Sequence, residues 1–215
     1  MSNPTTPASI GPGEFFPVVG VGPHEKPWPE GAHYDPELLL NGDRRNVLDH
    51  YRYWTVEAIV ADLDSKRHKL QIAIENWQHD LNIGSIVRTA NAFNVSGVHI
   101  VGKRDWNKRG AMVTDRYLTV HHHPTVEDFA LWCKENQLPI IGIDNVPGSK
   151  QLESAQLPEK CVLLFGQEGA GMSDEGIAVC EVLYEINQYG STRSMNASAA
   201  GAIAMYHWAL QHLPR

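Results

Sequence analysis

From residue 68 onward, short apolar runs alternate with segments in which apolar residues recur at helical spacing. The runs predict strands and the periodic segments predict helices, because buried positions repeat every two residues in a strand and every about 3.6 in a helix. The alternation predicts an α/β fold, a mostly parallel sheet with helices on both faces. The predicted strands are Leu70–Glu75, Val98–Val101, Ile140–Ile143, Cys161–Phe165 and Val182–Ile186, and the predicted helices are Asn82–Asn94, Val126–Asn136, Asp174–Val179 and Met195–Leu213.

The first 66 residues follow a different pattern. Residues 1–32 hold many prolines and glycines and little periodicity, which predicts an irregular arm. Residues 34–64 show helical spacing through Val47–Tyr51 and on to Val60, so we expect this part to be partly helical. We therefore divide the chain into an N-terminal extension, residues 1–66, and a main domain, residues 67–215.

The composition narrows the class of protein. No apolar run reaches the about 18 residues that a membrane span needs, and Met1–Gly13 lacks the basic and apolar regions of a signal peptide. Cys133, Cys161 and Cys180 form no C-x-x-C pair, so the sequence indicates neither a disulfide framework nor a zinc site. We therefore expect a cytoplasmic protein without a metal.

Three segments carry patterns that an ordinary structural element does not require. The first is Asn82–Phe93, where an N-capping asparagine precedes apolar residues at helical spacing. Arg88 lies beside the apolar stripe, early in this predicted helix. From spacing alone, a solvated arginine and a functional one are equally good interpretations.

The second segment is Leu163–Ser173, an apolar run that ends in a glycine-rich turn before a short helix. This layout presents backbone N–H groups to a ligand. Its G-x-x-G-x-G spacing is neither the dinucleotide fingerprint nor a P-loop, and the acidic Glu168 argues against a bound phosphate. A plain connection between a strand and a helix is the alternative interpretation.

The third segment, Ser191–Tyr206, packs small and polar residues together and then runs into helix-forming sequence. Small side chains let two backbones approach closely or let a ligand lie against the main chain. Ser194 or Asn196 can cap the helix that follows. A tightly packed small-residue helix is the alternative here.

In this order, the three segments resemble the sequence motifs of the SpoU (TrmH-like) family of SPOUT RNA 2'-O-ribose methyltransferases. The first motif, N-x-G-x-x-x-R-T-A-x-A-F, corresponds to Asn82–Phe93, the second, F-G-x-E-G-x-G, to Phe165–Gly171, and the third to Ser194–Gly201. The resemblance covers roughly residues 68–213. Residues 1–66 carry no motif that we assign.

The resemblance implies S-adenosylmethionine as cofactor, methyl transfer to a ribose 2'-hydroxyl of tRNA or rRNA, a homodimer, and a C-terminal trefoil knot formed by Gly190–Arg215. An apolar face of the last helix supports the homodimer: Ala199, Ala202, Met205, Trp208 and Ala209. The methyl transfer is an in-line displacement that needs no metal. Two other classes stay open: a catalytically inactive RNA-binding module of the same fold, and a different nucleotide-binding α/β enzyme.

The resemblance also implies roles for individual residues. Arg88, Glu168 and Asn196 are the catalytic candidates, with Arg88 acting on the reacting hydroxyl. Because arginine stays protonated, with a pKa above about 12, we expect it to grip a phosphate and stabilise negative charge, with Glu168 orienting Arg88 or the ribose. The expected cofactor-binding residues are Gly166, Glu168, Ile186, Gln188, Ser191, Met195 and Asn196.

The chain departs from the family pattern near the expected cofactor site. Gln167 stands where asparagine is usual, and Asn187-Gln188 stand where a proline and an apolar residue are common. Met195 and Ala197 replace the more frequent leucine and valine. These differences concern cofactor contacts, whereas Arg88, Glu168 and Asn196 match the motifs.

The net charge of −7 argues against a general nucleic-acid binder, so the distribution of charge matters more. One short segment gathers basic residues with Trp106 and Tyr117 between them. Cations for phosphates and aromatics for unstacked bases are how loop RNA is held, and a solvated charged loop is the alternative. The expected RNA-binding residues are Asn82, Arg88, Lys103, Arg104, Lys108, Arg109 and Arg116.

The triplet His121-His122-His123 raises the question of a metal site. On a strand, only His121 and His123 would share a face, and no acidic or cysteine partner is close in sequence. We expect no metal here, and partial protonation of these histidines near an RNA surface.

Overall fold

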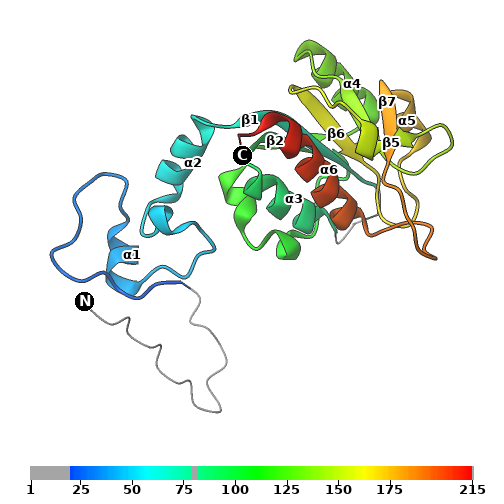
Figure 1. Cartoon of the computed structure of the whole chain (residues 1–215). Coiled ribbons are helices and arrows are strands. Elements are labelled where there is room, and N and C mark those ends of the chain that lie inside the picture. The colour runs from blue at the N-terminus through cyan, green and yellow to red at the C-terminus, as the bar shows by residue number, and fades with distance from the viewer. Residues whose placement is uncertain (1–19, 79–81, 215) are drawn as a thin grey trace. The chain divides into compact units, whose positions relative to one another are not determined.

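The computed structural model describes residues 20–78 and 82–214, and Figure 1 shows the path of the chain. The chain forms two compact units, one ending at Thr55 and the other beginning at Val56. The domain boundary expected at residue 66 stays a prediction. Part of the expected irregular arm, residues 1–19, lies outside the described residues, and residues 20–32 contain no helix or extended strand.

The first unit contains a short helix, α1 (Pro36–Asn41), and a 3₁₀ turn, η1 (Asp49–Tyr51). Buried Asp43 organises it, because its carboxylate accepts hydrogen bonds from Arg45 Nη2 at 2.7 Å and from the Tyr53 backbone N–H at 3.0 Å. Burial alone would raise the pKa of Asp43, but the hydrogen bonds from Arg45 and Tyr53 outweigh it and lower the pKa to about 2. A charged carboxylate therefore holds this unit together.

The second unit begins with helix α2 (Val56–Asp64) and is built around a seven-stranded sheet in the order β3-β2-β1-β6-β4-β7-β5 (Figure 1). Every neighbouring pair of strands is parallel. Strands β4 and β6 are continuous apolar runs, as expected of a parallel sheet buried on both faces. The strands are β1 (His68–Asn76), β2 (Val95–Gly102), β3 (Val120–His123), β4 (Ile140–Ile143), β5 (Lys150–Gln151), β6 (Cys161–Phe165) and β7 (Val182–Glu185).

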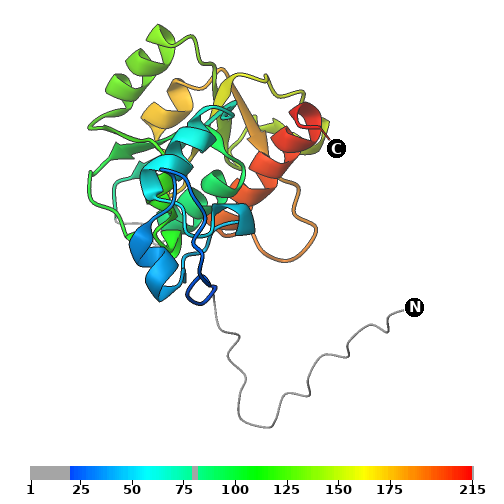
Figure 2. The same ribbon diagram turned by 90° about the vertical axis from the view of Figure 1, so that its left-hand side faces the viewer.

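Helices cover both faces of the sheet (Figures 1 and 2). Helices α3 (Asn82–Ala92) and α6 (Ala197–His212) lie side by side on one face, and α4 (Val126–Glu135) and α5 (Asp174–Ala178) share a second hydrophobic core on the other. Gly201 of α6 faces Ile86 of α3, and a Cβ on Gly201 would be in ordinary van der Waals contact with that side chain at 3.5 Å. Three 3₁₀ turns complete the unit: η2 (Lys108–Ala111), η3 (Thr114–Tyr117) and η4 (Leu152–Ser154).

The predicted α/β fold with a mostly parallel sheet is confirmed. The strands Ile140–Ile143 and Cys161–Phe165 have the predicted bounds, and α6 begins at Ala197 rather than Met195 because Asn196 is its N-cap. Strands β3 and β5 were not among the predicted strands. The trefoil knot implied by the resemblance stays a prediction.

The histidine triplet lies on β3, at the edge of the sheet. His121 and His123 share a face with buried His99 of β2, whose Nδ1 lies 2.9 Å from His123 Nε2, and Trp132 of α4 packs on all three rings. Burial lowers the pKa of His99 to about 2 and also lowers the pKa of His121 and His123. Burial therefore works against the expected partial protonation of these two histidines.

No group of three or more His, Cys, Asp or Glu side chains among the described residues is arranged to hold a metal ion. Among the described helices, none combines the length and the apolar character that crossing a membrane requires.

Candidate functional site

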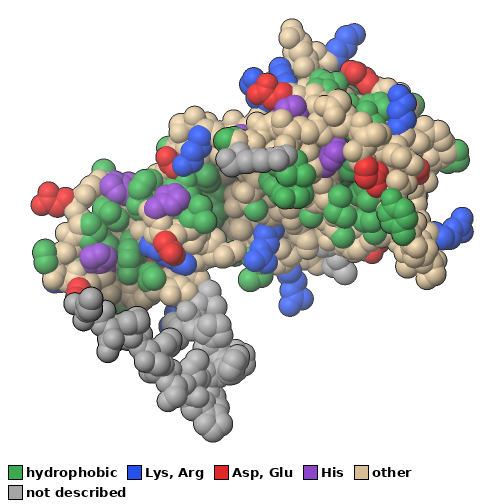
Figure 3. Space-filling view, viewed as in Figure 1, with side chains coloured by type: hydrophobic (Ala, Val, Ile, Leu, Met, Phe, Trp, Pro, Cys, Tyr) green, Lys and Arg blue, Asp and Glu red, His purple; other side chains and the backbone are tan. Residues whose placement is uncertain are grey.

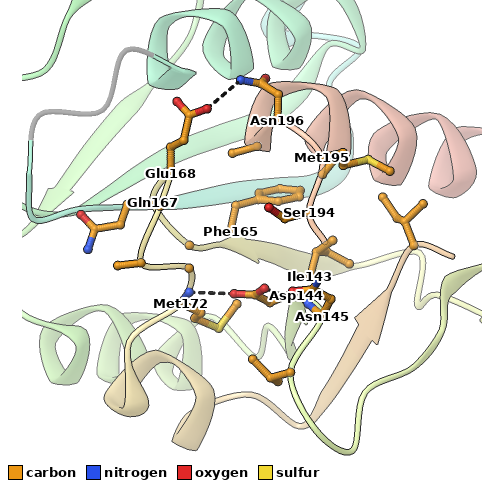
Figure 4. Close-up of a pocket in the computed structure, with 18 of the residues that line it drawn as sticks. Ile143, Asp144, Asn145, Phe165, Gln167, Glu168, Met172, Ser194, Met195 and Asn196 are labelled. Atoms are coloured by element: carbon orange, nitrogen blue, oxygen red, sulfur yellow. Dashed lines mark hydrogen bonds between the residues drawn. The ribbon is translucent and has the colours of Figure 1, made fainter. Parts of the chain in front are cut away.

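A cavity of about 600 Å³ opens at the carboxyl ends of β4, β6 and β7 (Figure 4). Ligands of open parallel sheets bind outside the carboxyl ends of the strands, because loops from several strands converge there. Three loops form the walls: the segment after β4, the glycine-rich turn after β6, and the segment between β7 and α6. The lining residues are Ile143–Val146, Phe165–Met172, Ile186, Gln188, Arg193–Ala197 and Ala200.

The glycine-rich turn has a shape that other residues could not adopt. The Gln167 N–H donates to the Gly171 carbonyl at 3.2 Å and the Gly171 N–H donates to the Gln167 carbonyl at 3.0 Å, which closes the turn. A Cβ on Gly166 would lie 2.2 Å from the backbone of Gly171 and Met172, and Gly169 has a φ of 89°. Glycine is therefore required where the backbone crosses itself beside the cavity.

Two carboxylates hold the end of this turn. Asp144 Oδ2 accepts a hydrogen bond from the Met172 backbone N–H at 2.7 Å (Figure 4), and Glu75 Oε2 accepts one from the Ser173 N–H at 2.7 Å. Glu75 is completely buried at the end of β1, so the turn is tied to the centre of the sheet. Sequence reasoning missed both residues. Their position at the carboxyl end of a predicted strand was the available signal.

The segment between β7 and α6 is held by side-chain amides. Asn145 Nδ2 donates to the Arg193 carbonyl at 2.6 Å, and Gln188 Nε2 donates to the same oxygen at 3.4 Å. The Oε1 atom of Gln188 is buried and has no hydrogen-bond partner in the described structure. The cavity wall thus contains an unsatisfied acceptor, which a ligand carrying an N–H donor would satisfy.

The three sequence motifs meet at one edge of the cavity. Asn82 Nδ2 donates to Glu168 Oε2 at 2.5 Å, and Asn196 Nδ2 donates to Asn82 Oδ1 at 2.8 Å. Asn196 Nδ2 also donates to Glu168 Oε1 at 3.3 Å (Figure 4). Asn196 Oδ1 accepts hydrogen bonds from the Ser198 and Ala199 N–H groups at the start of α6. One amide therefore caps α6 and fixes Glu168 at the same time. We call Asn82, Glu168 and Asn196 the amide–carboxylate network.

Arg88 lies outside this network. It is exposed on α3 and forms no hydrogen bond or ion pair with any part of the chain that the structure describes. The expected orientation of Arg88 by Glu168 therefore has no contact to support it here, because Asn82 and Asn196 hold the carboxylate. Arg88 is free to contact a ligand outside the cavity.

The predicted cofactor residues divide into two groups. Six of them line the cavity, and Ser191 is exposed and does not. Sequence reasoning missed the wall after β4, which contributes Asp144 and Asn145. The six that line the cavity are Gly166, Glu168, Ile186, Gln188, Met195 and Asn196.

The predicted RNA-binding residues also divide. Asn82 is buried within the amide–carboxylate network, and Tyr117 is buried, so neither side chain is open to a base or phosphate. Trp106 is half-buried, and Lys108 lies over its ring at 5.5 Å and pairs with Asp115 at 3.0 Å. The cations that the structure places on the surface are Arg88, Lys103, Arg104, Lys108, Arg109 and Arg116.

A parallel sheet with a glycine-lined cavity at the carboxyl ends of its strands is the arrangement of α/β enzymes that bind a small organic cofactor. Residues 69–206 match the model of the SpoU rRNA Methylase family. The chain belongs to this family.

Three curated relatives illustrate the similarity. The chain is 25% identical over 147 residues to a tRNA (guanosine(18)-2'-O)-methyltransferase of Borreliella burgdorferi, covering 67% of both proteins. It is 29% identical over 163 residues to an uncharacterized tRNA/rRNA methyltransferase of Synechocystis, covering 73% of this chain and 42% of that one. The chain also spans 64% of the tRNA (guanosine(18)-2'-O)-methyltransferase of Escherichia coli, less than two thirds of its length.

Solved structures of the same family share the fold. The SpoU methyltransferase AviRb from Streptomyces viridochromogenes superposes with a TM-score of 0.63 and 24% identity, covering 71% of this chain and 63% of that one. The TrmH/SpoU tRNA modifying enzyme of A. aeolicus superposes with a TM-score of 0.64 and 21% identity, covering 73% and 81% of the two chains.

Proposed function

We propose that this protein is an S-adenosylmethionine-dependent RNA methyltransferase that transfers a methyl group to a ribose 2'-hydroxyl of tRNA or rRNA. The observation that carries the proposal is the meeting of the three family motifs at one edge of the cavity, where Asn82, Glu168 and Asn196 bind one another. The family membership and the names of the relatives, which are tRNA and rRNA methyltransferases, support the same activity.

The residues of the cavity fit the cofactor. Its volume of about 600 Å³ lies in the range of about 300–1,000 Å³ typical of small-molecule sites. The backbone crossing at Gly166 leaves no room for a side chain and presents bare main chain, and the unsatisfied Gln188 Oε1 is an acceptor for an amino group. The carboxylates of Asp144 and Glu168 line the cavity, and their negative charge would favour the positive sulfonium of the cofactor. When bound, S-adenosylmethionine supplies an activated methyl group on a sulfonium.

The residues around the cavity then act mainly by positioning. Holding two reactants in near-attack geometry contributes about 7–11 kcal/mol in favourable cases. The amide–carboxylate network fixes the start of α6 and the glycine-rich turn relative to α3, which carries Arg88. Arg88 binds the phosphate next to the reacting ribose and stabilises negative charge on its oxygen, and an RNA phosphate or water accepts the hydroxyl proton.

We also propose that the protein is a homodimer. The residues of α6 that support this proposal differ from those expected from the sequence. Met205, Trp208 and Ala209 are buried in the protomer's own core. Instead, Ile203, Tyr206 and Leu210 are 42%, 57% and 43% exposed and form one stripe of α6, where hydrophobic side chains gather in Figure 3. An exposed apolar stripe of this kind supports the proposal of an association surface.

Sedimentation tests the dimer. Tyr206→Lys places a charge in the middle of the stripe and should convert a dimer to a monomer at micromolar concentration. Leu131→Lys, at a residue that is 57% exposed on α4, is the matched control and should leave the dimer intact. A wild-type monomer with full activity would refute this proposal. The cytoplasmic location expected from the sequence stays a prediction.

Methyl transfer to RNA tests the activity. Purified protein, labelled S-adenosylmethionine and total RNA from cells without this protein should give labelled 2'-O-methyl nucleosides, and mapping their positions identifies the RNA. Calorimetry with S-adenosylhomocysteine should show binding that Asp144→Asn and Gln188→Leu weaken. If the protein bound neither S-adenosylmethionine nor S-adenosylhomocysteine, the result would oppose the proposal. RNA binding without cofactor binding would favour an inactive RNA-binding module.

A further inference from the structure

The loop between η2 and η3 carries two apolar side chains on its surface. Met112 is 58% exposed and Val113 is 54% exposed. Both have left-handed backbone conformations, with φ angles of 48° and 65°. A β-branched residue with such an angle is an outlier, because its Cβ crowds the backbone. The chain therefore keeps an unfavourable conformation at an exposed position.

The residues on either side hold the loop in this shape. Ala111 and Thr114 are buried, and Thr114 Oγ1 donates a hydrogen bond to the Ala111 carbonyl at 2.7 Å. The Met112 N–H donates to the Arg109 carbonyl. The two residues between these anchors turn outward, and their side chains contribute little to the core. A strained conformation that does not serve packing is typical of a functional contact.

The loop lies against the helix that carries Arg88. A Cβ on Gly84 would come within 2.8 Å of the Ala111 backbone nitrogen, and one on Gly110 within 2.9 Å of the Ser85 nitrogen. Because residues four apart share a face of a helix, Arg88 follows Gly84 on the side of α3 that the loop covers, one turn further along. The apolar pair therefore belongs to a loop on the side of α3 that carries Arg88.

The segment that carries the pair is rich in cations. Lys103, Arg104, Arg109 and Arg116 are exposed in it, together with one exposed carboxylate, Asp105. Apolar side chains in a segment rich in cations complement a nucleic acid whose bases are unstacked, since phosphates bind the cations and base faces cover the apolar atoms. A paired RNA helix complements them less, because its base faces are hidden in the stack.

We propose that Met112 and Val113 contact an unstacked base of the substrate RNA, next to the ribose that Arg88 receives. This inference rests on the proposed function, and it adds that the substrate is a loop or another single-stranded segment. The strained backbone keeps both side chains outward before RNA arrives, so that little ordering is required on binding.

Fluorescence anisotropy with two labelled probes tests the proposal: an RNA hairpin with a single-stranded loop and a fully paired duplex of the same length. Wild-type protein should prefer the hairpin. Met112→Ala and Val113→Gly should each weaken hairpin binding by about tenfold, the scale of losing one base contact, and should leave duplex binding unchanged. Leu131→Ala, which removes a similarly exposed apolar side chain from α4, is the control and should change neither affinity.

Two further measurements separate this role from a structural one. Val113→Gly should raise the melting temperature, because glycine adopts positive φ angles freely, while it weakens binding of the hairpin. The slope of affinity against salt should be unchanged in the two apolar variants and smaller in Arg109→Ala, which loses a phosphate contact.

Equal wild-type affinity for hairpin and duplex, or wild-type hairpin affinity in both apolar variants, would overturn the inference. Neither result would touch the proposed function, which methyl transfer to RNA tests separately. Absence of methyl transfer together with preferential binding of the hairpin would refute the proposed function and would leave the inferred base contact intact.

Discussion

The amide–carboxylate network predicts a large difference between two substitutions of one residue. Asn196→Asp keeps an oxygen that caps α6, but it replaces the Nδ2 donor by a second oxygen, 3.3 Å from Glu168 Oε1 and 2.8 Å from Asn82 Oδ1. Asn196→Ser also keeps a cap, because serine caps helices about as well as asparagine, but it introduces no charge. The two variants therefore share the cap and differ in the repulsion.

The magnitude follows from the distances. Two like charges about 4 Å apart repel by about 1 kcal/mol in water and about 4 kcal/mol near a protein surface. Because Asn196 is exposed, we take a repulsion near the lower end of this range, about 2 kcal/mol. A negative charge at the N-terminus of α6 stabilises the helix by about 0.3–1 kcal/mol and offsets part of this repulsion. Asn196→Asp should therefore be less stable than Asn196→Ser by about 1–2 kcal/mol at neutral pH.

Urea unfolding at several pH values measures this difference. Two adjacent carboxylates raise the pKa of the pair, so the folded variant binds a proton more readily than the unfolded chain. The deficit of Asn196→Asp should then be largest near pH 7 and should shrink as the pH falls towards about 4. An aspartate variant as stable as the serine variant at neutral pH would show that Glu168 and residue 196 are not in contact in solution.

Three further predictions concern the arginine, the turn and the buried histidine. Arg88→Ala should lower the single-turnover methylation rate about a hundredfold or more and leave the affinity for S-adenosylhomocysteine unchanged. Arg88→Lys should restore little of the rate, because a point charge cannot replace a planar contact. A defect confined to cofactor affinity would contradict this role. Gly166→Ala should abolish cofactor binding in calorimetry, because the new Cβ would lie 2.2 Å from backbone atoms, and wild-type affinity would refute that geometry. Burial lowers the pKa of His99 to about 2, so the contribution of the neutral ring to stability is complete above the unfolded pKa of about 6.5 and falls by about 1.4 kcal/mol per pH unit below it. His99→Gln should remove this contribution to the pH dependence of the unfolding free energy, measured by urea unfolding between pH 7 and 5. The same pH dependence in the variant and the wild type would count against the prediction.

Local pattern predicts the central strands because each is bounded by a clear change of composition. The run Ile140–Ile143 follows a proline and Cys161–Phe165 ends at a glycine, and both strands have the predicted bounds. The hydrophobic pattern did not predict strand β3, because the sequence of this strand is not apolar. His121 is half-buried and His123 is buried, and both rings pack against His99 and Trp132 in contacts that a hydrophobic period does not predict.

The site shows the same division between local and distant information. Glycine spacing indicates the turn after β6 because its constraint is local. Glu75 binds Ser173, 98 residues further along the chain, and Asn196 binds Asn82 across 114 residues. Pairings at such separations depend on the tertiary fold, so the sequence identified Asn82, Glu168 and Asn196 as candidates but not their contacts with one another.

The surroundings of Arg88 also depend on contacts between residues that are distant in the sequence. The helical spacing places it beside the apolar stripe of α3, and the structure shows it exposed. Its proximity to the Met112–Val113 loop depends on the contact of Gly84 with Gly110 and Ala111, which is visible only once the segments have packed.

The chemical position of the transferred methyl group tests the central claim most directly. RNA treated with the protein and labelled S-adenosylmethionine can be digested with nucleases and with alkali, which does not cleave beside a 2'-O-methyl ribose. The account predicts label in alkali-resistant dinucleotides with wild-type protein, and almost none with Arg88→Ala at saturating cofactor. Label on a base, or equal labelling of the ribose by both proteins, would contradict the account.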